Sequence, residues 1–169
     1  MLSQRKAWRC TMAASKRKKG NIKQGGTPVD GIRMGGSPDS VWSLHPVWNV
    51  ASCDIDAEGS WSFHKERLRD EFWDVIFPRL REFERMTWND IFVSSSKQNH
   101  GIDPRGLNKC ARDRLFDLRI EAESIYSLRL GGGLRLYGFL VGATYNILWY
   151  DNDHGDNDTC VCRSHKKHT

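Results

Sequence analysis

The sequence predicts an α+β protein in which helices pack on one face of a small antiparallel sheet, preceded by a disordered basic N-terminal tail. Residues 126–151 alternate between apolar and polar side chains around two glycine-containing turns, the pattern of three antiparallel strands. Apolar residues recur at helical spacing over residues 68–83, which is typical of an amphipathic helix. We therefore expect a tail and linker over residues 1–41 and a single domain over residues 42–169.

The positive charge is concentrated in the tail. Eight of the 26 Lys and Arg residues lie within residues 1–26, which contain no acidic residue. The rest of the chain has 18 basic and 21 acidic residues, so the net charge of +5 is a property of the tail. Such a segment adds non-specific affinity for phosphate, or it is simply a solvated leader.

Composition also bears on location. No run of 18 apolar residues is present, so we expect no membrane-spanning helix and no membrane partner. Residues 1–20 lack the apolar core of a secretory signal, although they are compatible with an organelle transit peptide. The five cysteines form an odd, unpatterned set, which favours a reducing compartment. We expect a cytoplasmic protein.

Local signals place the first elements. Residues 41–50 are aromatic and β-branched but contain Pro46, which favours a short edge strand or an irregular packed segment. Residues 61–64 are a candidate second strand. In the amphipathic helix that follows, Pro78 is expected to introduce a kink or to split the helix after Phe77.

Two capping signals predict further helices. Thr87 and Asp90 resemble a capping box that opens a short helix over residues 88–92. Asp103 followed by Pro104 predicts the start of another helix. The apolar stripe of that helix consists of Leu107, Ala111, Leu115 and Leu118.

The first glycine-rich turn brings two arginines together. If residues 131–133 are a three-residue loop, Leu130 pairs with Leu134 and Arg129 pairs with Arg135. Like charges directly opposite each other destabilise a sheet. A pair of this kind indicates an acidic neighbour or an anionic ligand, and we take it as the best sign of a binding site.

The second turn extends this arrangement. With Gly142 and Ala143 as a two-residue turn, Tyr150 pairs with Arg135, so Arg129, Arg135 and Tyr150 form a row across three strands. The predicted core face holds Tyr126, Leu128, Leu130, Leu134, Leu136, Leu140, Tyr145, Ile147 and Trp149. The opposite face is mixed, with Ser127, Arg129, Arg135, Tyr137, Thr144, Asn146 and Tyr150 beside Phe139, Val141 and Leu148.

These residues suggest phosphate binding. Arginine side chains bind phosphates through two parallel hydrogen bonds. Alternatively, each arginine pairs with an acidic residue of a neighbouring segment, such as Glu121 or Glu123. Tyr137 and Tyr150 are candidates to stack on bases or to donate a hydroxyl, or they are ordinary cross-strand aromatics.

Basic residues outside the sheet are further candidates. Lys97 and His100 belong to a polar loop and could lie near a phosphate, with His100 as a general acid or base. The loop could equally be only a solvated connection. His154 and the C-terminal His165, Lys166, Lys167 and His168 could protonate a leaving oxygen and stabilise developing charge, or form a basic tail.

A zinc site is an alternative use of the C-terminal segment. Cys160, Cys162, His165 and His168 are four zinc-competent ligands, but their spacing is tighter than the usual C-x2-C pattern. Zinc is therefore not expected, although a small zinc-stabilised interaction domain remains an alternative.

The order of elements resembles the RelE/ParE superfamily of small bacterial toxins. Shared features are a short strand, two or three helices and a three-stranded meander carrying arginines. Residues 88–169 are also similar to a group of small bacterial and phage proteins with the pattern S-L-R-L…R-x-x-G…I-L-W-x-D-x-x-H…K-K-H. The matching positions are 127–130, Arg135, Gly138, 147–151, His154 and 166–168.

The resemblance implies the toxin of a toxin–antitoxin system, a metal-independent mRNA endoribonuclease that uses no cofactor. Its partners would be RNA or ribosome-bound mRNA and an antitoxin protein. The ribose 2′-hydroxyl attacks the adjacent phosphate in such chemistry, so RNA is required. The catalytic candidates are then Arg129, Arg135, Tyr150, His154 and His168, and the RNA-binding candidates are Lys97, His100, Tyr137, Lys166 and Lys167.

Two features leave the activity open. ParE-like relatives share the fold and act on gyrase instead, and this chain departs from the pattern in its long N-terminal extension and its Cys-x-Cys segment. The alternative is a non-catalytic protein that uses the same basic face to bind nucleic acid or an acidic protein partner.

Overall fold

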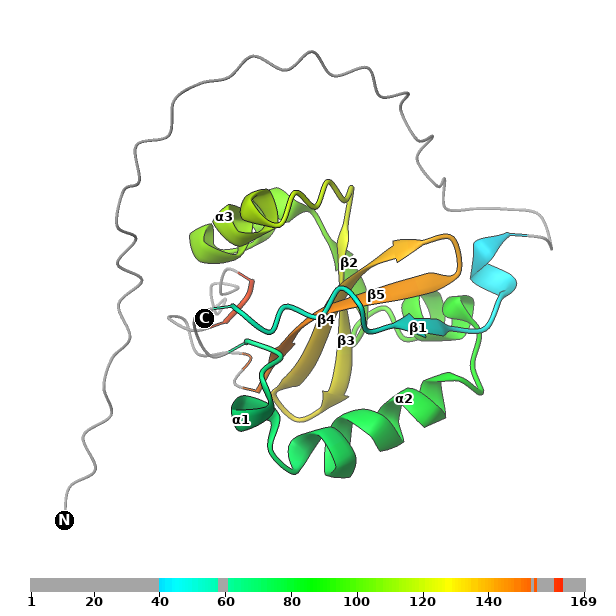
Figure 1. The fold of residues 1–169 in the computed structure, drawn as a ribbon. Helices are drawn as coiled ribbons and strands as arrows, with labels where there is room; N and C mark the ends of the chain where they lie inside the picture. Colours follow the sequence, from blue (N-terminus) through cyan, green and yellow to red (C-terminus); the bar gives the residue numbers. More distant parts are fainter. Residues whose placement is uncertain (1–39, 58–60, 153, 155–159, 163–169) are drawn as a thin grey trace, which may run out of the picture. The chain divides into compact units, whose positions relative to one another are not determined.

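The computed structural model describes residues 40–57, 61–152, 154 and 160–162. The chain divides into two units, Met1–Gly35 and Gly36–Thr169, and all of the described residues belong to the second. That unit is an α+β structure built around a single five-stranded sheet (Figure 1).

The strands of the sheet are β1 (Val47–Asn49), β2 (His100–Ile102), β3 (Ile125–Gly131), β4 (Leu134–Val141) and β5 (Thr144–Asp151). They lie in the order β1-β5-β4-β3-β2. The predicted meander is confirmed, because β3, β4 and β5 pair antiparallel through two tight turns. The sheet as a whole is mixed rather than antiparallel, because the edge strand β1 runs parallel to β5.

The helical segments that precede β2 are short, and the first of them lies before β1. They are a 3-10 turn η1 (Val41–Ser43), α1 (Lys65–Leu68), a π-helical turn η2 (Phe72–Ile76), α2 (Phe77–Phe83) and a second π-helical turn η3 (Asp90–Ser94). The expected break near Pro78 is a change from π to α geometry between Ile76 and Phe77. Pro78 falls in the first turn of α2, where its missing N–H costs little.

Capping explains where the later helical segments begin. The predicted capping box is confirmed: the Thr87 N–H and hydroxyl both donate to Asp90, at 2.9 and 2.7 Å. Asp103 caps only a 3-10 turn, η4 (Pro104–Gly106). The helix itself, α3 (Lys109–Asp117), begins later and is capped by Asn108, whose Oδ1 accepts the Ala111 N–H at 2.8 Å.

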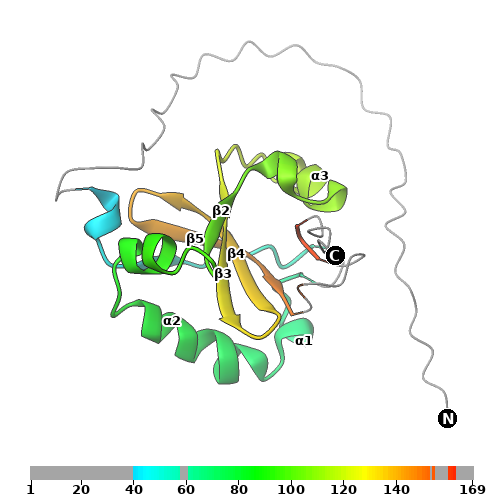
Figure 2. The ribbon, with the colours of Figure 1, turned by 180° about the vertical axis from the view of Figure 1, so that it is seen from behind.

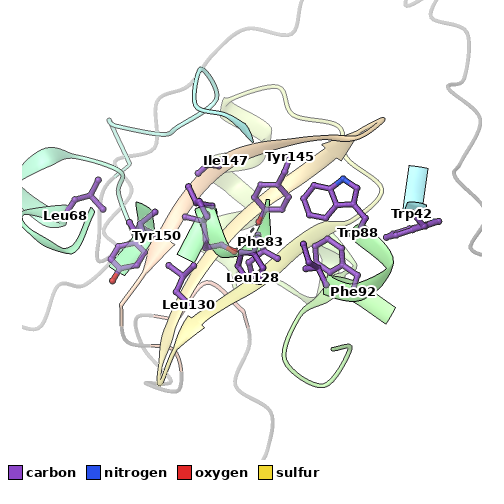
Figure 3. Packing of buried hydrophobic residues seen from close by; sticks show 14 residues of the cluster. Trp42, Leu68, Phe83, Trp88, Phe92, Leu128, Leu130, Tyr145, Ile147 and Tyr150 are labelled. Atoms are coloured by element: carbon purple, nitrogen blue, oxygen red, sulfur yellow. Dashed lines mark hydrogen bonds between the residues drawn. The ribbon is translucent and has the colours of Figure 1, made fainter. Parts of the chain in front are cut away.

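Helices pack on both faces of the sheet, and the prediction of a single covered face is wrong. Figures 1 and 2 show α2 and α3 on opposite sides of the strands. One core lies beneath α2 and η3 and includes Ile76, Leu80, Phe83, Trp88, Ile91, Phe92, Leu128, Leu136, Tyr145 and Ile147 (Figure 3). The second core lies beneath α3 and includes Leu107, Ala111, Leu115, Ile125, Tyr137, Leu148, Trp149 and Val161.

A bulge in β5 changes the predicted register. Val141 pairs with Thr144 as expected, but the pairing shifts by one residue between Gly138↔Ile147 and Tyr137↔Trp149. Leu148 and Trp149 therefore both face the α3 core, and Tyr150 turns to the α2 core. The same kind of irregularity occurs near the β3–β4 turn, where Gly131 rather than Leu130 pairs with Leu134.

Residues 61–64 are not a strand. Trp61 is buried against Trp149, and its carbonyl oxygen accepts the Tyr150 N–H at 3.1 Å. Among the residues that the structure describes, none of the helices combines the length and the apolar character that crossing a bilayer requires.

Candidate functional site

The two arginines lie directly opposite each other on adjacent strands, as predicted. Arg129 of β3 pairs with Arg135 of β4. Because residues paired across strands point to the same face, both side chains leave the sheet on the α3 side. Neither guanidinium belongs to an ion pair within the part of the chain that the structure describes, so Glu121 and Glu123 do not neutralise them.

Arg135 is held by the adjacent turn. Its guanidinium donates to the carbonyl oxygens of Gly132, at 3.0 Å, and Leu134, at 2.9 Å. Partial burial lowers the pKa of Arg135, and the neighbouring charge of Arg129 lowers it further. The pair is therefore a site of concentrated positive charge whose mutual repulsion an anion would relieve.

A carboxylate continues the row in place of the predicted tyrosine. Asp151, not Tyr150, pairs with Arg135. Its side chain is buried, accepts the Val161 N–H at 3.3 Å and exerts a favourable charge interaction on Arg135. One carboxylate beside two guanidinium groups leaves a net charge of about +1 in the row.

The two predicted tyrosines are not available to a ligand. Tyr150 is 1% exposed and packs in the α2 core with Leu130 and Leu136 (Figure 3). The prediction that it stands beside the arginines is wrong, because the bulge in β5 rotates it to the other face. Tyr137 shares the face of the arginines but is fully buried, which rules out stacking on a base.

Lys97 and His100 lie on the β3 side of the arginine pair. Asn99 is buried and its Oδ1 accepts the backbone N–H of Arg129 at 2.8 Å, which holds the turn containing the exposed Lys97 beside β3. His100 begins β2 and pairs with Ser127, two residues before Arg129. Both basic residues are therefore on elements that adjoin the arginine pair.

A second group of side chains lies where β5 ends. His154, Cys160 and Cys162 have their potential ligand atoms within 4.8 Å of one another. The Sγ atoms of the two cysteines are 3.4 Å apart, and Nδ1 of His154 lies 3.2 Å from Cys160 Sγ. The Tyr137 hydroxyl completes the group, at 3.2 Å from His154 Nδ1 and 3.5 Å from Cys162 Sγ.

The segment carrying the cysteines is fixed by contacts to both α3 and the sheet. Val161 is fully buried in the α3 core, and its carbonyl oxygen accepts the Asn108 N–H at 2.9 Å. Cys162 forms an isolated β-bridge with Leu107. The Asn108 side chain donates to the Cys160 carbonyl oxygen. One residue thus both caps α3 and anchors this segment.

The two thiols are not equivalent. Hydrogen bonding with Cys160, together with the Tyr137 hydroxyl, lowers the pKa of Cys162 to about 6 against the opposing effect of burial. The same interaction with Cys162, and burial, raise the pKa of Cys160. Cys162 therefore loses its proton more readily than Cys160 does.

The predicted C-terminal site residues divide into two sets. Cys160 and Cys162 adjoin each other, and His154 joins them rather than standing beside the arginines. His165, Lys166, Lys167 and His168 lie outside the described residues. The contact of His154 with the cysteines was not predicted, although the spacing His154-x5-Cys160-x-Cys162 is visible in the chain.

No family model matches the chain, and neither the curated proteins nor the solved structures include a match.

Proposed function

We propose that this protein binds RNA, with Arg129 and Arg135 as ligands of the phosphate backbone. The observation that carries the proposal is their direct cross-strand pairing without an ion-pair partner among the described residues. Such a pair is unfavourable in the free protein and becomes favourable when a phosphate lies between the two guanidinium groups.

Neighbouring features favour a polyanion over a small acid. Lys97 and His100 lie on the turn and the strand that adjoin β3, which makes them candidates for further phosphate contacts. The basic residues 1–26 supply further phosphate contacts on the same chain. A polymer can engage several of these groups at once, and a single small anion can engage only one cluster.

The test is RNA binding by the full chain and by the variant Arg129→Ala/Arg135→Ala. Each charged hydrogen bond to phosphate contributes about 1.5–3 kcal/mol, so we expect affinity for a single-stranded RNA to fall about tenfold or more for each arginine. Fluorescence anisotropy at a fixed salt concentration measures this loss, and circular dichroism verifies that the variant is folded.

A matched control is Arg81→Ala/Arg85→Ala. It removes the same charge from exposed positions at and after the end of α2, on the other side of the sheet. If this control loses as much affinity as the double variant of the pair, the arginine pair is not the binding site. If the wild type binds an acidic peptide but not RNA, the arginine pair binds a protein partner instead.

RNA cleavage is a second candidate function, and one contact favours it. The backbone N–H of His154 donates to the Gly133 carbonyl oxygen at 3.0 Å, which holds this histidine next to the turn that Arg135 also contacts. His154 Nδ1 faces the cysteines, so Nε2 is the ring nitrogen left for proton transfer. A 2′-hydroxyl would attack the adjacent phosphate, release the 5′-oxygen and leave a 2′,3′-cyclic phosphate.

With this activity the protein would act as a toxin of the RelE type, controlled by an antitoxin. We expect expression of the wild type to arrest growth and to yield RNA fragments with 2′,3′-cyclic phosphate ends in the presence of chelator. Arg129→Ala/Arg135→Ala should relieve the arrest, and the Arg81→Ala/Arg85→Ala control should not. RNA that is bound and left intact would contradict cleavage while leaving the binding proposal in place.

A further inference from the structure

We propose that His154, Cys160 and Cys162 form a zinc site that holds the segment 160–162 on the end of the sheet. This site differs from the set Cys160, Cys162, His165 and His168 that spacing alone suggested, because it takes its nitrogen ligand from the residues just after β5. It does not depend on RNA binding.

The separations of the three ligand atoms fit a tetrahedral metal. With Zn–S bonds of about 2.3 Å and Zn–N bonds of about 2.0–2.1 Å, tetrahedral geometry puts two sulfurs about 3.8 Å apart and a sulfur and a nitrogen about 3.6 Å apart. The two Sγ atoms are 3.4 Å apart, and Nδ1 of His154 is 3.2 and 3.6 Å from them. Small outward movements of the two thiols would admit the ion.

The donor atoms select the metal. Two thiolates and one imidazole are ligands for zinc, whereas calcium and magnesium require oxygen ligands. Binding would displace protons from the thiols and replace their mutual contact by two Zn–S bonds. The fourth position of the tetrahedron is left for a water molecule or another side chain.

The cysteine ligands lie in a mostly buried environment. Cys160 is 3% and Cys162 is 7% exposed, and the neighbouring Tyr137 is fully buried, so the cluster is largely shielded from bulk water. The Tyr137 hydroxyl, 3.5 Å from Cys162 Sγ, is in position to donate to a metal-bound thiolate. Outer hydrogen bonds of this kind orient metal ligands and raise metal affinity.

The ion would join three parts of the structure. His154 follows β5, the segment 160–162 contacts α3 through Asn108, and Tyr137 belongs to the central strand β4. A metal bond across these parts would therefore stabilise the α3 core at the edge where β5 ends.

Metal binding by the reduced full chain tests the proposal. We expect the chain to take up about one equivalent of zinc in an anaerobic titration and to show a higher melting temperature with zinc than with chelator. Cobalt in place of zinc should give the absorption of a tetrahedral site with a thiolate-to-cobalt charge-transfer band. Reduced wild-type chain that takes up no metal overturns the proposal, as does metal uptake without the thiolate band.

Variants separate this site from adventitious binding. Cys160→Ser, Cys162→Ser and His154→Ala should each lose the metal while melting near the temperature of the metal-free wild type. The control Cys53→Ser/Cys110→Ser removes the other two cysteines of the described residues and should keep the metal. Tyr137→Phe should keep the metal with affinity about tenfold lower. If the control loses the metal and the cluster variants retain it, the site is elsewhere.

Discussion

Replacement of Asp54 by alanine is expected to lower the free energy of unfolding by about 3 kcal/mol, because it leaves a largely buried cation without its partner. Both carboxylate oxygens of Asp54 accept from the Arg114 guanidinium, at 2.7 and 2.8 Å, and one also accepts from Trp149 Nε1 at 3.0 Å. The Asp54 side chain is 2% exposed, but Arg114 is 27% exposed and keeps some contact with solvent. The expected loss therefore lies at the lower end of the range for buried ion pairs.

The same interaction predicts the pH dependence of stability. Burial alone would raise the pKa of Asp54, but the hydrogen bonds from Arg114 and Trp149 and the charge of Arg114 hold it below its usual range. The folded protein therefore binds this proton less readily than the unfolded chain does. Its contribution is fully present above about pH 3.9 and is lost as the pH falls through the folded pKa.

Urea unfolding of wild type, Asp54→Ala and a control checks both expectations. In the control, Asp113→Ala, an exposed pair with Lys109 is removed, and the expected cost is about 0.5 kcal/mol or less. The difference between wild type and Asp54→Ala should shrink as the pH falls below the unfolded pKa of aspartate. A cost for Asp54→Ala no larger than that of the control would show that the buried pair contributes nothing.

Replacement of Gly138 by alanine is expected to cost about 3 kcal/mol, because the added methyl group has no space. An ideal Cβ would lie 2.3 Å from the carbonyl oxygen of Asn146 and 2.6 Å from Cε1 of Tyr145. The Tyr145 ring is fully buried, and its hydroxyl donates to the Tyr126 and Leu136 carbonyl oxygens, so the ring has little freedom to move.

The control for this substitution is Gly106→Ala, whose Cβ would make only an ordinary contact of 3.5 Å with Ile102. We expect that variant to unfold within about 0.5 kcal/mol of the wild type. If Gly138→Ala is as stable as Gly106→Ala, the Tyr145 ring does not pack closely against Gly138 of β4.

The sequence was sufficient to predict the hairpins and the arginine pair. The glycine-containing turns at residues 131–133 and 142–143 follow segments in which apolar and polar side chains alternate. The turn residues and this alternation together determine how the strands pair. Both features act over a few residues. The capping box of Thr87 and Asp90 was predictable for the same reason.

The bulge and the second core were not predictable by these rules. In β5, the apolar run Ile147, Leu148, Trp149 and Tyr150 has no polar residue to mark a face. A strand of this kind is buried on both sides, and one extra residue can be inserted without exposing an apolar side chain. The prediction that all helices pack on one face of the sheet was wrong for the same reason, because this apolar run does not show that both faces are covered.

The proximity of His154 to the cysteines depends on tertiary structure. Val161 must enter the α3 core, and Asn108 must hold the backbone of the segment 160–162, before the thiols meet the imidazole. Neither contact has a local signature, because the partners are distant in the sequence. The sequence pattern grouped Cys160 and Cys162 with His165 and His168 as potential zinc ligands, and it did not indicate that His154 lies beside the cysteines.

The salt dependence of RNA binding is the most direct measurement of whether the arginine pair contacts phosphate. A plot of log affinity against log salt concentration should be less steep for Arg129→Ala/Arg135→Ala than for the wild type by about 1.4, because each phosphate neutralised on a single strand contributes about 0.7. The N-terminal basic segment is present in both proteins, so its contribution cancels. Equal slopes for the two proteins would contradict phosphate binding by Arg129 and Arg135.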